Sequence, residues 1–183
     1  MSQIEDLTSN DPERIEQVAT FLPACFQQYS PNWLRDRAAC LEEIEESFAA
    51  DRRSRVLLDD QGTAVGWIGA ITDEHLWEIH PIAVSPDAQR LGHGRRLVDD
   101  ICQLAKDHGA VAIWAGTSDE TSSTSFSKMD LYTDAAKAMG PFDAPSDHPL
   151  WFWSKMGFAI VGVQPDEEGL GKPGIHFAKR LMT

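Results

Sequence analysis

Hydrophobic residues recur at helical spacing in three stretches of the chain. In the first, residues 13–27, apolar side chains follow one another every three or four positions, and Asn10 or Asp11 precedes them as a candidate cap. The other two stretches cover 37–49 and 92–108, and the stripe is clearest in the last. We therefore expect three helices over these ranges.

The helix expected at 37–49 has an apolar side and an acidic side. Leu41, Ile44 and Phe48 share one face of it. Its other sides are crowded by glutamates: Glu42, Glu43, Glu45 and Glu46. Because charged side chains are seldom fully buried, we place these glutamates away from the packed face.

Short apolar runs with strand-like composition alternate with these helices. They predict strands at 54–58, 64–72, 76–84, 111–114, 158–163 and 175–181. Pro81 interrupts the third of them, and because proline lacks a backbone N–H, strand pairing should break there. A long polar loop spans 117–148, and a short helix is expected at 149–156. This order predicts a mixed α/β fold around one sheet, as a single domain over 1–183.

Composition narrows the classes of partner. The 183-residue chain carries 16 basic and 29 acidic residues, giving a net charge of −13. Such an excess of acid argues against a nucleic-acid partner and suits a small cationic molecule, although it also suits mere solubility. No apolar run approaches the ~20 residues that cross a bilayer, and the first residues lack a secretory pattern, so we expect a cytoplasmic protein without a membrane partner.

The cysteines indicate neither disulfides nor a metal site. Cys25, Cys40 and Cys102 are an odd number and are widely spaced, and no Cys-x-x-Cys pair is present. The spacing of His75 and His80 also differs from that of a His-Glu-x-x-His zinc motif. We therefore expect no metal cofactor.

The strongest chemical signal follows the strand that contains Pro81. Two glycines stand at the start of the third helix, within the segment Gln89, Arg90, Leu91, Gly92, His93, Gly94, Arg95 and Arg96. Glycines at a helix N-terminus let backbone N–H groups approach an anion, and the helix dipole favours negative charge there. Three arginines add cations to an otherwise acidic chain, so the segment predicts a pyrophosphate site.

Other phosphate-binding motifs fit this segment less well. A Rossmann G-x-G-x-x-G pattern fails because Leu97 occupies the third glycine position. A Walker A loop fails because no Gly-Lys-Ser/Thr follows. A plain glycine turn before a surface helix is the ordinary alternative, which the interrupted strand and the arginines make less attractive.

An interrupted strand, a Gln-x-x-Gly-x-Gly turn and an amphipathic helix together resemble the acetyl-CoA site of the GNAT superfamily of N-acyltransferases. The resemblance implies the GNAT fold, with one mixed, largely antiparallel sheet that splays at the Pro81 strand and helices on both faces. It implies that Ile82, Ala83 and Val84 bind the pantetheine arm through their backbones. It also implies that the segment from Gln89 to Arg96 holds the pyrophosphate.

Further segments resemble one branch, the aminoglycoside 6′-N-acetyltransferases of the small chromosomally encoded type. They include Trp77-Glu78-Ile79-His80-Pro81, Asp130-Leu131-Tyr132, His148-Pro149, Lys155-Met156-Gly157-Phe158 and Lys172-Pro173. The match runs from about Gly66 to Lys179. The resemblance implies acetyl-CoA as co-substrate, the 6′-amine of an aminoglycoside as acceptor, a role in antibiotic resistance and a homodimer.

The expected reaction is direct attack of an amine on the thioester in a ternary complex. Strand geometry places Glu78 and His80 on the same face, and we favour Glu78 as the group that orients the ammonium over a role as proton acceptor. His80 is equally well explained as a base or as a structural histidine. The N–H of Ile82, released by the strand break, is a candidate donor to the developing oxyanion.

The acceptor pocket is expected to be acidic and partly aromatic. Its candidate residues are Trp33, Trp77, Glu78, Asp119, Glu120 and Asp130, although ordinary solvation explains each of the loop acids equally well. The resemblance implies that Trp153 stands beside the coenzyme, at the position where the superfamily often has a tyrosine that protonates the leaving thiolate. An indole cannot supply that proton, which leaves Tyr132 as a candidate substitute. Other acceptors, such as a polyamine or a protein N-terminus, and a non-catalytic acyl-CoA-binding module stay open.

Overall fold

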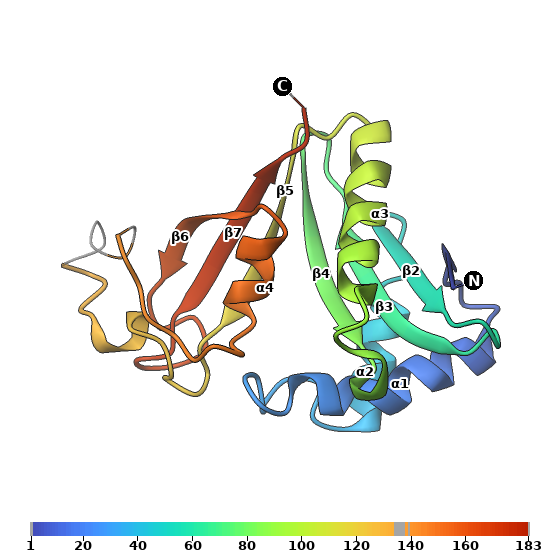
Figure 1. Ribbon diagram of the computed structural model, residues 1–183, viewed down its shortest axis with the longest axis horizontal. Helices are drawn as coiled ribbons and strands as arrows, with labels where there is room; N and C mark the ends of the chain where they lie inside the picture. The colour runs from blue at the N-terminus through green and yellow to red at the C-terminus, as the bar shows by residue number, and fades with distance from the viewer. Residues whose placement is uncertain (1, 134–137, 139, 183) are drawn as a thin grey trace. The chain divides into compact units, whose positions relative to one another are not determined.

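Figure 1 shows the computed structural model, which describes residues 2–133, 138 and 140–182. The chain divides into two compact units. One consists of Met1–Gln28, Trp33–Ile113 and Arg180–Thr183, and the other of Tyr29–Asn32 and Trp114–Lys179. Seven strands and four α-helices lie within the described residues, which confirms the predicted mixed α/β class.

The sheet of the first unit is antiparallel. Its strands lie in the order β1 (Gln3–Asp6), β2 (Arg52–Leu58), β3 (Ala64–Ile71) and β4 (Leu76–Val84). The last three agree with the predicted ranges within two residues at each end. β1 was not predicted, because four residues with polar ends give little periodicity and pair only with a strand some fifty positions later.

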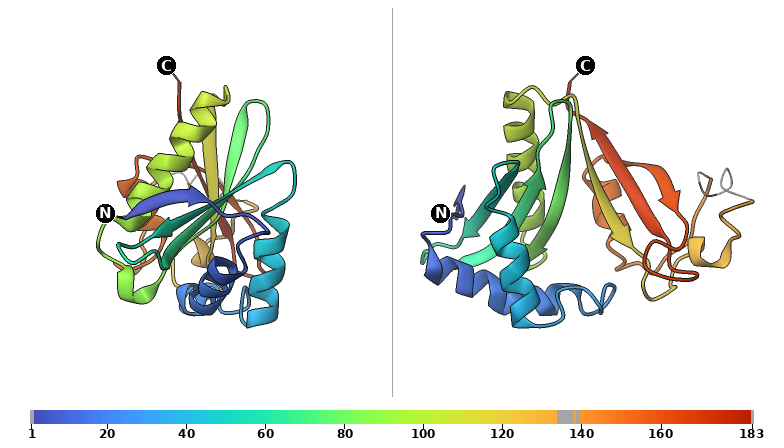
Figure 2. Two further views of the ribbon diagram at one scale, coloured as in Figure 1. Left: turned by 90° about the vertical axis from the view of Figure 1, so that its right-hand side faces the viewer. Right: turned by 180° about the vertical axis from the view of Figure 1, so that it is seen from behind.

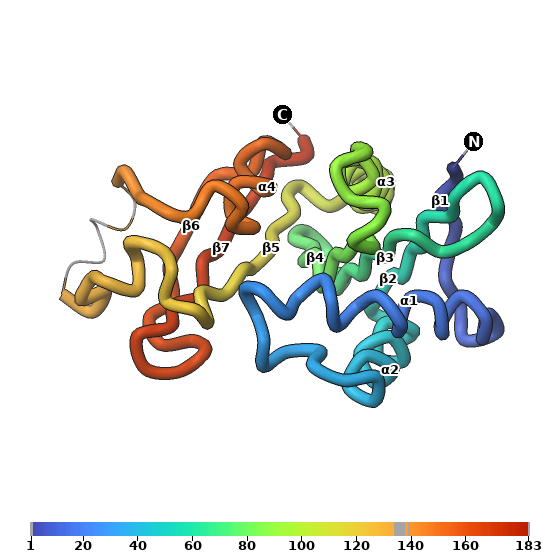
Figure 3. The backbone as a smooth tube through the Cα atoms, turned by 60° about the horizontal axis from the view of Figure 1, so that its bottom comes forward, coloured from blue at the N-terminus to red at the C-terminus, as the bar shows by residue number. Residues whose placement is uncertain are grey.

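Helices cover both faces of this sheet. α3 (His93–Asp107) lies in front of β2, β3 and β4 in Figure 1, whereas α1 (Pro12–Phe26) and α2 (Arg37–Glu46) lie in front when the molecule is seen from behind in Figure 2. Figure 3 follows the backbone along the connection from α1 to α2. Within the described residues, no helix combines the length and the apolar character needed to span a bilayer.

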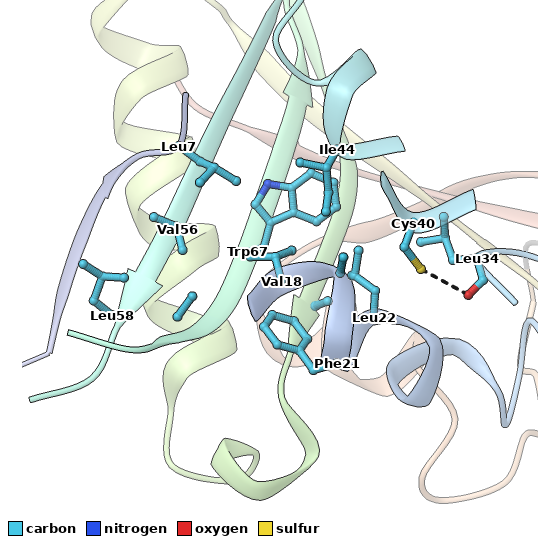
Figure 4. Packing of buried hydrophobic residues seen from close by; sticks show 13 residues of the cluster. Leu7, Val18, Phe21, Leu22, Leu34, Cys40, Ile44, Val56, Leu58 and Trp67 are labelled. Atoms are coloured by element: carbon cyan, nitrogen blue, oxygen red, sulfur yellow. Dashed lines mark hydrogen bonds between the residues drawn. The ribbon is translucent and has the colours of Figure 1, made fainter. Parts of the chain in front are cut away.

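The core between α1, α2 and the sheet is shown in Figure 4. Trp67 of β3 is fully buried there, and its indole N–H donates to Ser54 Oγ at 2.9 Å. Cys40 of α2 is also buried, and its Sγ donates to Leu34 O. Burying each large apolar side chain contributes roughly 1.5–3 kcal/mol, so this core fixes α2 firmly against the sheet.

The second unit has three strands in the order β5 (Ala112–Ser118), β7 (Gly174–Arg180) and β6 (Ala159–Gln164). β5 begins in the last two residues of the first unit, and β6 and β7 are antiparallel. Among the described residues of this unit there is one α-helix, α4 (Leu150–Lys155). Two 3-10 turns complete the described elements, η1 (Pro86–Ala88) and η2 (Phe126–Lys128).

Candidate functional site

A β-bulge interrupts the pairing of β3 with β4. Ile68 pairs with Ile82 and Ala70 pairs with Ile79, so both His80 and Pro81 stand opposite Gly69. This register shift confirms the predicted break at Pro81. Only glycine fits at position 69, because a Cβ there would lie 2.3 Å from the His80 carbonyl oxygen.

The bulge also changes which residues of β4 point to which face of the sheet. Before the bulge, Trp77 packs beside His108 at the end of α3, and His80, within the bulge, faces α2. After it, Ala83 belongs to the core shared with α1 and α2. Since side chains alternate along a strand, Ile82 then faces the side of α3.

His80 lies between two carboxylates. Its Nδ1 is 3.7 Å from Glu78 Oε1, and its Nε2 is 3.4 Å from Glu43 Oε1 of α2. The predicted proximity of Glu78 and His80 is therefore observed. The ring of Trp33, a predicted substrate residue, lies 5.6 Å from that of His80. No group of three or more potential metal ligands occurs within the described part of the chain.

Burial shifts both members of the His80–Glu43 pair toward their neutral forms. Desolvation lowers the pKa of His80, which Glu78 and Glu46 partly offset and Arg52 reinforces. Desolvation also raises the pKa of Glu43, as do Glu46 and Glu42, while Arg52 lowers it. A histidine that stays neutral around pH 7 can accept a proton, so the cluster has the electrostatics of a proton-transfer site.

The glycine turn at the start of α3 has an open, left-handed backbone. Gly92 caps the helix at φ +84°, and a Cβ at this position would meet nothing within 4 Å. Arg90 also has a positive φ, of 65°. The first intrahelical bond runs from the Arg96 N–H to Gly92 O, so the N–H groups of His93 and Gly94 have no acceptor within the helix.

This turn fits an anionic group. His93 Nδ1 is buried and has no hydrogen-bond partner within the described residues. Arg90, Leu91 and Arg95 are exposed around the turn. N–H groups aimed outward from a helix N-terminus, two exposed arginines and an unsatisfied imidazole nitrogen are the features of a phosphate cradle.

Two residues of the predicted coenzyme segment have other partners. The Arg96 guanidinium donates to Ser2 Oγ and to Ser2 O, the latter at 2.7 Å, so we do not retain it as a phosphate ligand. Gln89 Nε2 donates to Val84 O at 3.0 Å, which fastens the turn to the end of β4. Gln89 thus supports the turn through its side chain.

The carbonyl of Val84 is fully engaged. It accepts from Gln89 and also from Cys25 Sγ at 3.2 Å. Since a carbonyl oxygen has two lone pairs, little capacity remains for the pantetheine arm at this atom. Burial raises the pKa of the Cys25 thiol to about 12, so the thiol stays protonated and keeps donating.

Asp119 of the second unit differs from its predicted role as a substrate ligand. Its side chain is 0 % exposed. Oδ1 accepts from the N–H and hydroxyl of Ser123, and Oδ2 from the N–H and hydroxyl of Thr124. Burial alone would raise the pKa of Asp119, but the bonds from Thr124 and Ser123 outweigh it and the pKa is lowered. This carboxylate therefore shapes its own loop.

The other predicted loop acids also have partners within the second unit. Glu120 is buried, and its Oε2 accepts from the N–H and from Nδ2 of Asn32, at 3.1 and 2.7 Å. Asp130 is exposed and accepts from the Tyr132 N–H and the Thr133 hydroxyl. Tyr132 donates its hydroxyl to Asp166, which raises the pKa of the phenol.

Two predicted aromatic site residues are packed into their units instead. Trp77 is buried, and its indole N–H donates to Asp73 O at 3.0 Å. Packing and this hydrogen bond thus fix its indole in the first unit. Trp153 is 4 % exposed and lies 5.1 Å from the ring of Phe158, within the aromatic core of the second unit.

The proximity of Glu43 to His80 was not predicted from the sequence. Glu43 was placed on the acidic side of α2, yet the buried residues of that helix are Cys40 and Ile44, followed by Ser47. Glu43 lies three residues after Cys40 and four before Ser47, hence on the same side of the helix. Those small buried residues were the available signal.

The acetyltransferase (GNAT) family matches residues 16–132. An aminoglycoside 6′-N-acetyltransferase solved with coenzyme A is 30 % identical, with a TM-score of 0.87 over 99 % of this chain and 98 % of that one. The aminoglycoside 6′-N-acetyltransferase of Enterococcus faecium is also 30 % identical over the same shares, with a TM-score of 0.85.

More distant structures share the fold. One is the ribosomal-protein-S18-alanine N-acetyltransferase of Escherichia coli, 15 % identical with a TM-score of 0.65 over 100 % of this chain and 96 % of that one. No curated protein sequence matches the chain.

Proposed function

The chain belongs to the acetyltransferase (GNAT) family and has its fold, and from this premise we propose that it acetylates the 6′-amine of an aminoglycoside with acetyl-CoA. The observation that carries the proposal is the bulged strand β4, which brings Glu78 and His80 together and leads into the glycine turn of α3. The two 6′-acetyltransferases at 30 % identity over nearly the whole chain support this acceptor.

The glycine turn and the end of β4 are assigned to acetyl-CoA, which supplies the acetyl group as a thioester. The N–H groups of His93 and Gly94, with Arg90 and Arg95, hold the pyrophosphate. The backbones of Ile82 and Ala83 and the remaining N–H of Val84 line the pantetheine arm. Replacing Gly92 by valine should abolish acetyl-CoA binding in calorimetry, because it forces a branched side chain into a left-handed turn. Wild-type affinity would overturn this assignment.

Glu78 and His80 are assigned to the acceptor. Glu78, whose side chain is 23 % exposed, orients the ammonium by charge. The ammonium must lose a proton before its nitrogen attacks the thioester carbon, and a neutral His80 is placed to accept it. The nitrogen then bonds to the thioester carbon, and the N–H of Ile82 stabilises the carbonyl oxygen as it gains charge. The C–S bond breaks, CoA leaves as a thiolate, and the excess proton of the new amide nitrogen passes to that thiolate.

Net charge supports a cationic acceptor. With a net charge of −13, the chain attracts polyamines in general. The charge therefore favours a cationic acceptor without singling out the 6′-amine. A homodimer, a single domain over 1–183 and a cytoplasmic location stay predictions. Size-exclusion chromatography with light scattering tests the first of these.

Release of CoA from acetyl-CoA in the presence of different amines tests the proposal. We expect rapid release with kanamycin and slow release with spermidine or a short peptide. Release only with spermidine or the peptide would replace the acceptor class. Binding of acetyl-CoA without release on any amine would favour a non-catalytic module, an alternative that Trp153 supports because it offers no hydroxyl to the leaving thiolate.

A further inference from the structure

We propose that Glu43 is a positioning residue that holds His80 in the Nε2–H form, so that Nδ1 faces Glu78 and accepts the proton of the acceptor ammonium. The proposal deepens the proposed function and rests on it for the identity of the proton donor. The arrangement of Glu43 and His80 themselves is independent of any acceptor.

The first support is the setting of Glu43 within α2. Its side chain is only 12 % exposed, although glutamates are rarely buried. Oε1 is buried and makes no hydrogen bond with any described residue, and the ring atom that faces it is His80 Nε2 at 3.4 Å. A buried acceptor without a donor is costly, and the proton of an Nε2–H imidazole is the nearest remedy.

The second support is the asymmetry of the two ring nitrogens. With the proton on Nδ1, the lone pair of Nε2 would face the lone pairs of Glu43 Oε1. With the proton on Nε2, that repulsion becomes attraction at the shorter of the two contacts. Nδ1 then presents its lone pair to the Glu78 carboxylate across the longer distance of 3.7 Å, where a cation between the two atoms relieves their repulsion. This separation is too long for a direct hydrogen bond, so an ammonium can donate to both atoms.

The proton balance follows from this geometry. An N–H bond of the acceptor ammonium breaks, its electron pair becomes the nucleophile, and the proton binds His80 Nδ1. The resulting imidazolium is attracted by the Glu43 carboxylate, whose Oε1 lies 3.4 Å from Nε2. Glu43 therefore stabilises the product of proton transfer without touching the acceptor.

Other charged groups act on His80 from three elements. Glu78 lies on its own strand, Glu46 on α2 and Arg52 on β2. Burial opposes the charged imidazole, while Glu78 and Glu46 favour it. Glu43 Oε1 lies 3.4 Å from His80 Nε2, so removing the charge of Glu43 should have a larger effect on His80 than removing that of the exposed Glu45.

Nitrogen NMR titration of the purified protein without acceptor tests the arrangement directly. Six histidines are present, and His80→Gln assigns the signal. We expect the Nε2–H tautomer in the wild type. Glu43→Gln should lower the pKa of His80 by about one unit, whereas Glu45→Gln, an exposed change on the same helix, should shift it by less than about 0.3. An Nδ1–H tautomer, or equal shifts in the two variants, would refute the proposal.

A kinetic arm links the arrangement to catalysis. In a pH profile of kcat/KM with an accepted amine, Glu43→Gln should move the acidic limb by the same amount as the NMR titration and lower kcat about tenfold, with KM unchanged. Glu43→Asp should restore part of kcat. An acidic limb that stays in place despite a shifted NMR pKa would refute the positioning role.

The two proposals fail in different ways. If no amine is acetylated while the NMR results are as expected, the acceptor assignment fails and the Glu43–His80 arrangement stands. Thermal melting of Glu43→Gln and Glu45→Gln confirms that both variants are folded at the temperature of the titration.

Discussion

The buried acids of the two units are satisfied in opposite ways. In the second unit, both oxygens of Asp119 are taken up by four donors from Ser123 and Thr124. In the first, Glu43 Oε1 has no hydrogen bond with a described residue and lies 3.4 Å from His80. Both carboxylates are withdrawn from water, but only Glu43 has an oxygen that is still able to accept a proton or face a positive charge.

This difference distinguishes acids that stabilise the fold from acids that are available for proton transfer. A buried carboxylate with a complete set of donors has a lowered pKa and stabilises its loop. A buried carboxylate without donors has a raised pKa and is retained at a cost, which a role in proton transfer explains. The distinction predicts that mutations in the two places change different quantities.

The largest expected effect comes from the bulge that brings the first group together. Gly69→Ala puts a Cβ against the His80 carbonyl and should lower the free energy of unfolding by about 3 kcal/mol. Chemical denaturation measures this loss. Gly162→Ala is the matched control, because a Cβ at that strand position meets nothing within 4 Å; a similar loss in both variants would contradict the tight fit at the bulge.

Next in size is the loss of charge at Glu78. Glu78→Gln keeps the shape but removes the charge that orients the ammonium, so kcat/KM for the acceptor should fall by about 100-fold. The free energy of unfolding, followed by thermal melting, should stay within about 0.5 kcal/mol of that of the wild type. Unchanged kinetics on an accepted amine would remove Glu78 from the site.

Asp119→Asn should change the stability of the protein, whereas Glu78→Gln changes its kinetics. The amide nitrogen cannot accept from the donors that now bond one of the two oxygens, which costs about 2 kcal/mol of unfolding free energy. Asp130→Asn, an exposed change in the same loop, serves as its control. If Asp119→Asn left stability intact and abolished turnover, the acid would belong to the substrate site after all.

The carboxylate of Asp119 should also affect how the stability of the protein depends on pH in the acidic range. Because the pKa of Asp119 in the folded protein lies below its ordinary value of 3.8, its contribution is complete above that value and is lost as the pH falls below it. Wild-type stability should therefore fall more steeply between about pH 4 and pH 2 than that of Asp119→Asn. Parallel curves would contradict this.

The smallest effect is expected at Trp153. Because it packs on Phe158 and Phe177, Trp153→Phe should cost about 1 kcal/mol of stability. CoA release should stay within about twofold of the wild type, because an indole donates no proton to the leaving thiolate. A much larger loss of turnover in the folded variant would place the indole at the coenzyme.

Local periodicity made much of the fold predictable. The strand over 76–84 and the helix over 92–108 were recognised because apolar spacing reports directly on the local backbone, and Pro81 marked the bulge. β1 escaped because its existence depends on β2, far away in the chain.

The site was predictable only in part. Glu78, His80 and the glycine turn follow from strand alternation and motif spacing. Glu43 did not, because its partner comes from a strand 37 positions later. The structural partners of two other residues could have been read from the sequence. Alternation sets Trp77 on the face opposite Glu78, and serine and threonine follow Asp119 at loop-capping distance.

We propose above all that this acetyltransferase acts on a 6′-amine. The most direct measurement compares kcat/KM for CoA release on kanamycin with that on the same scaffold lacking the 6′-amine, under otherwise identical conditions. We predict turnover on the first and a loss of at least about 100-fold on the second, because the reacting nitrogen is gone. Equal turnover on both would contradict the account.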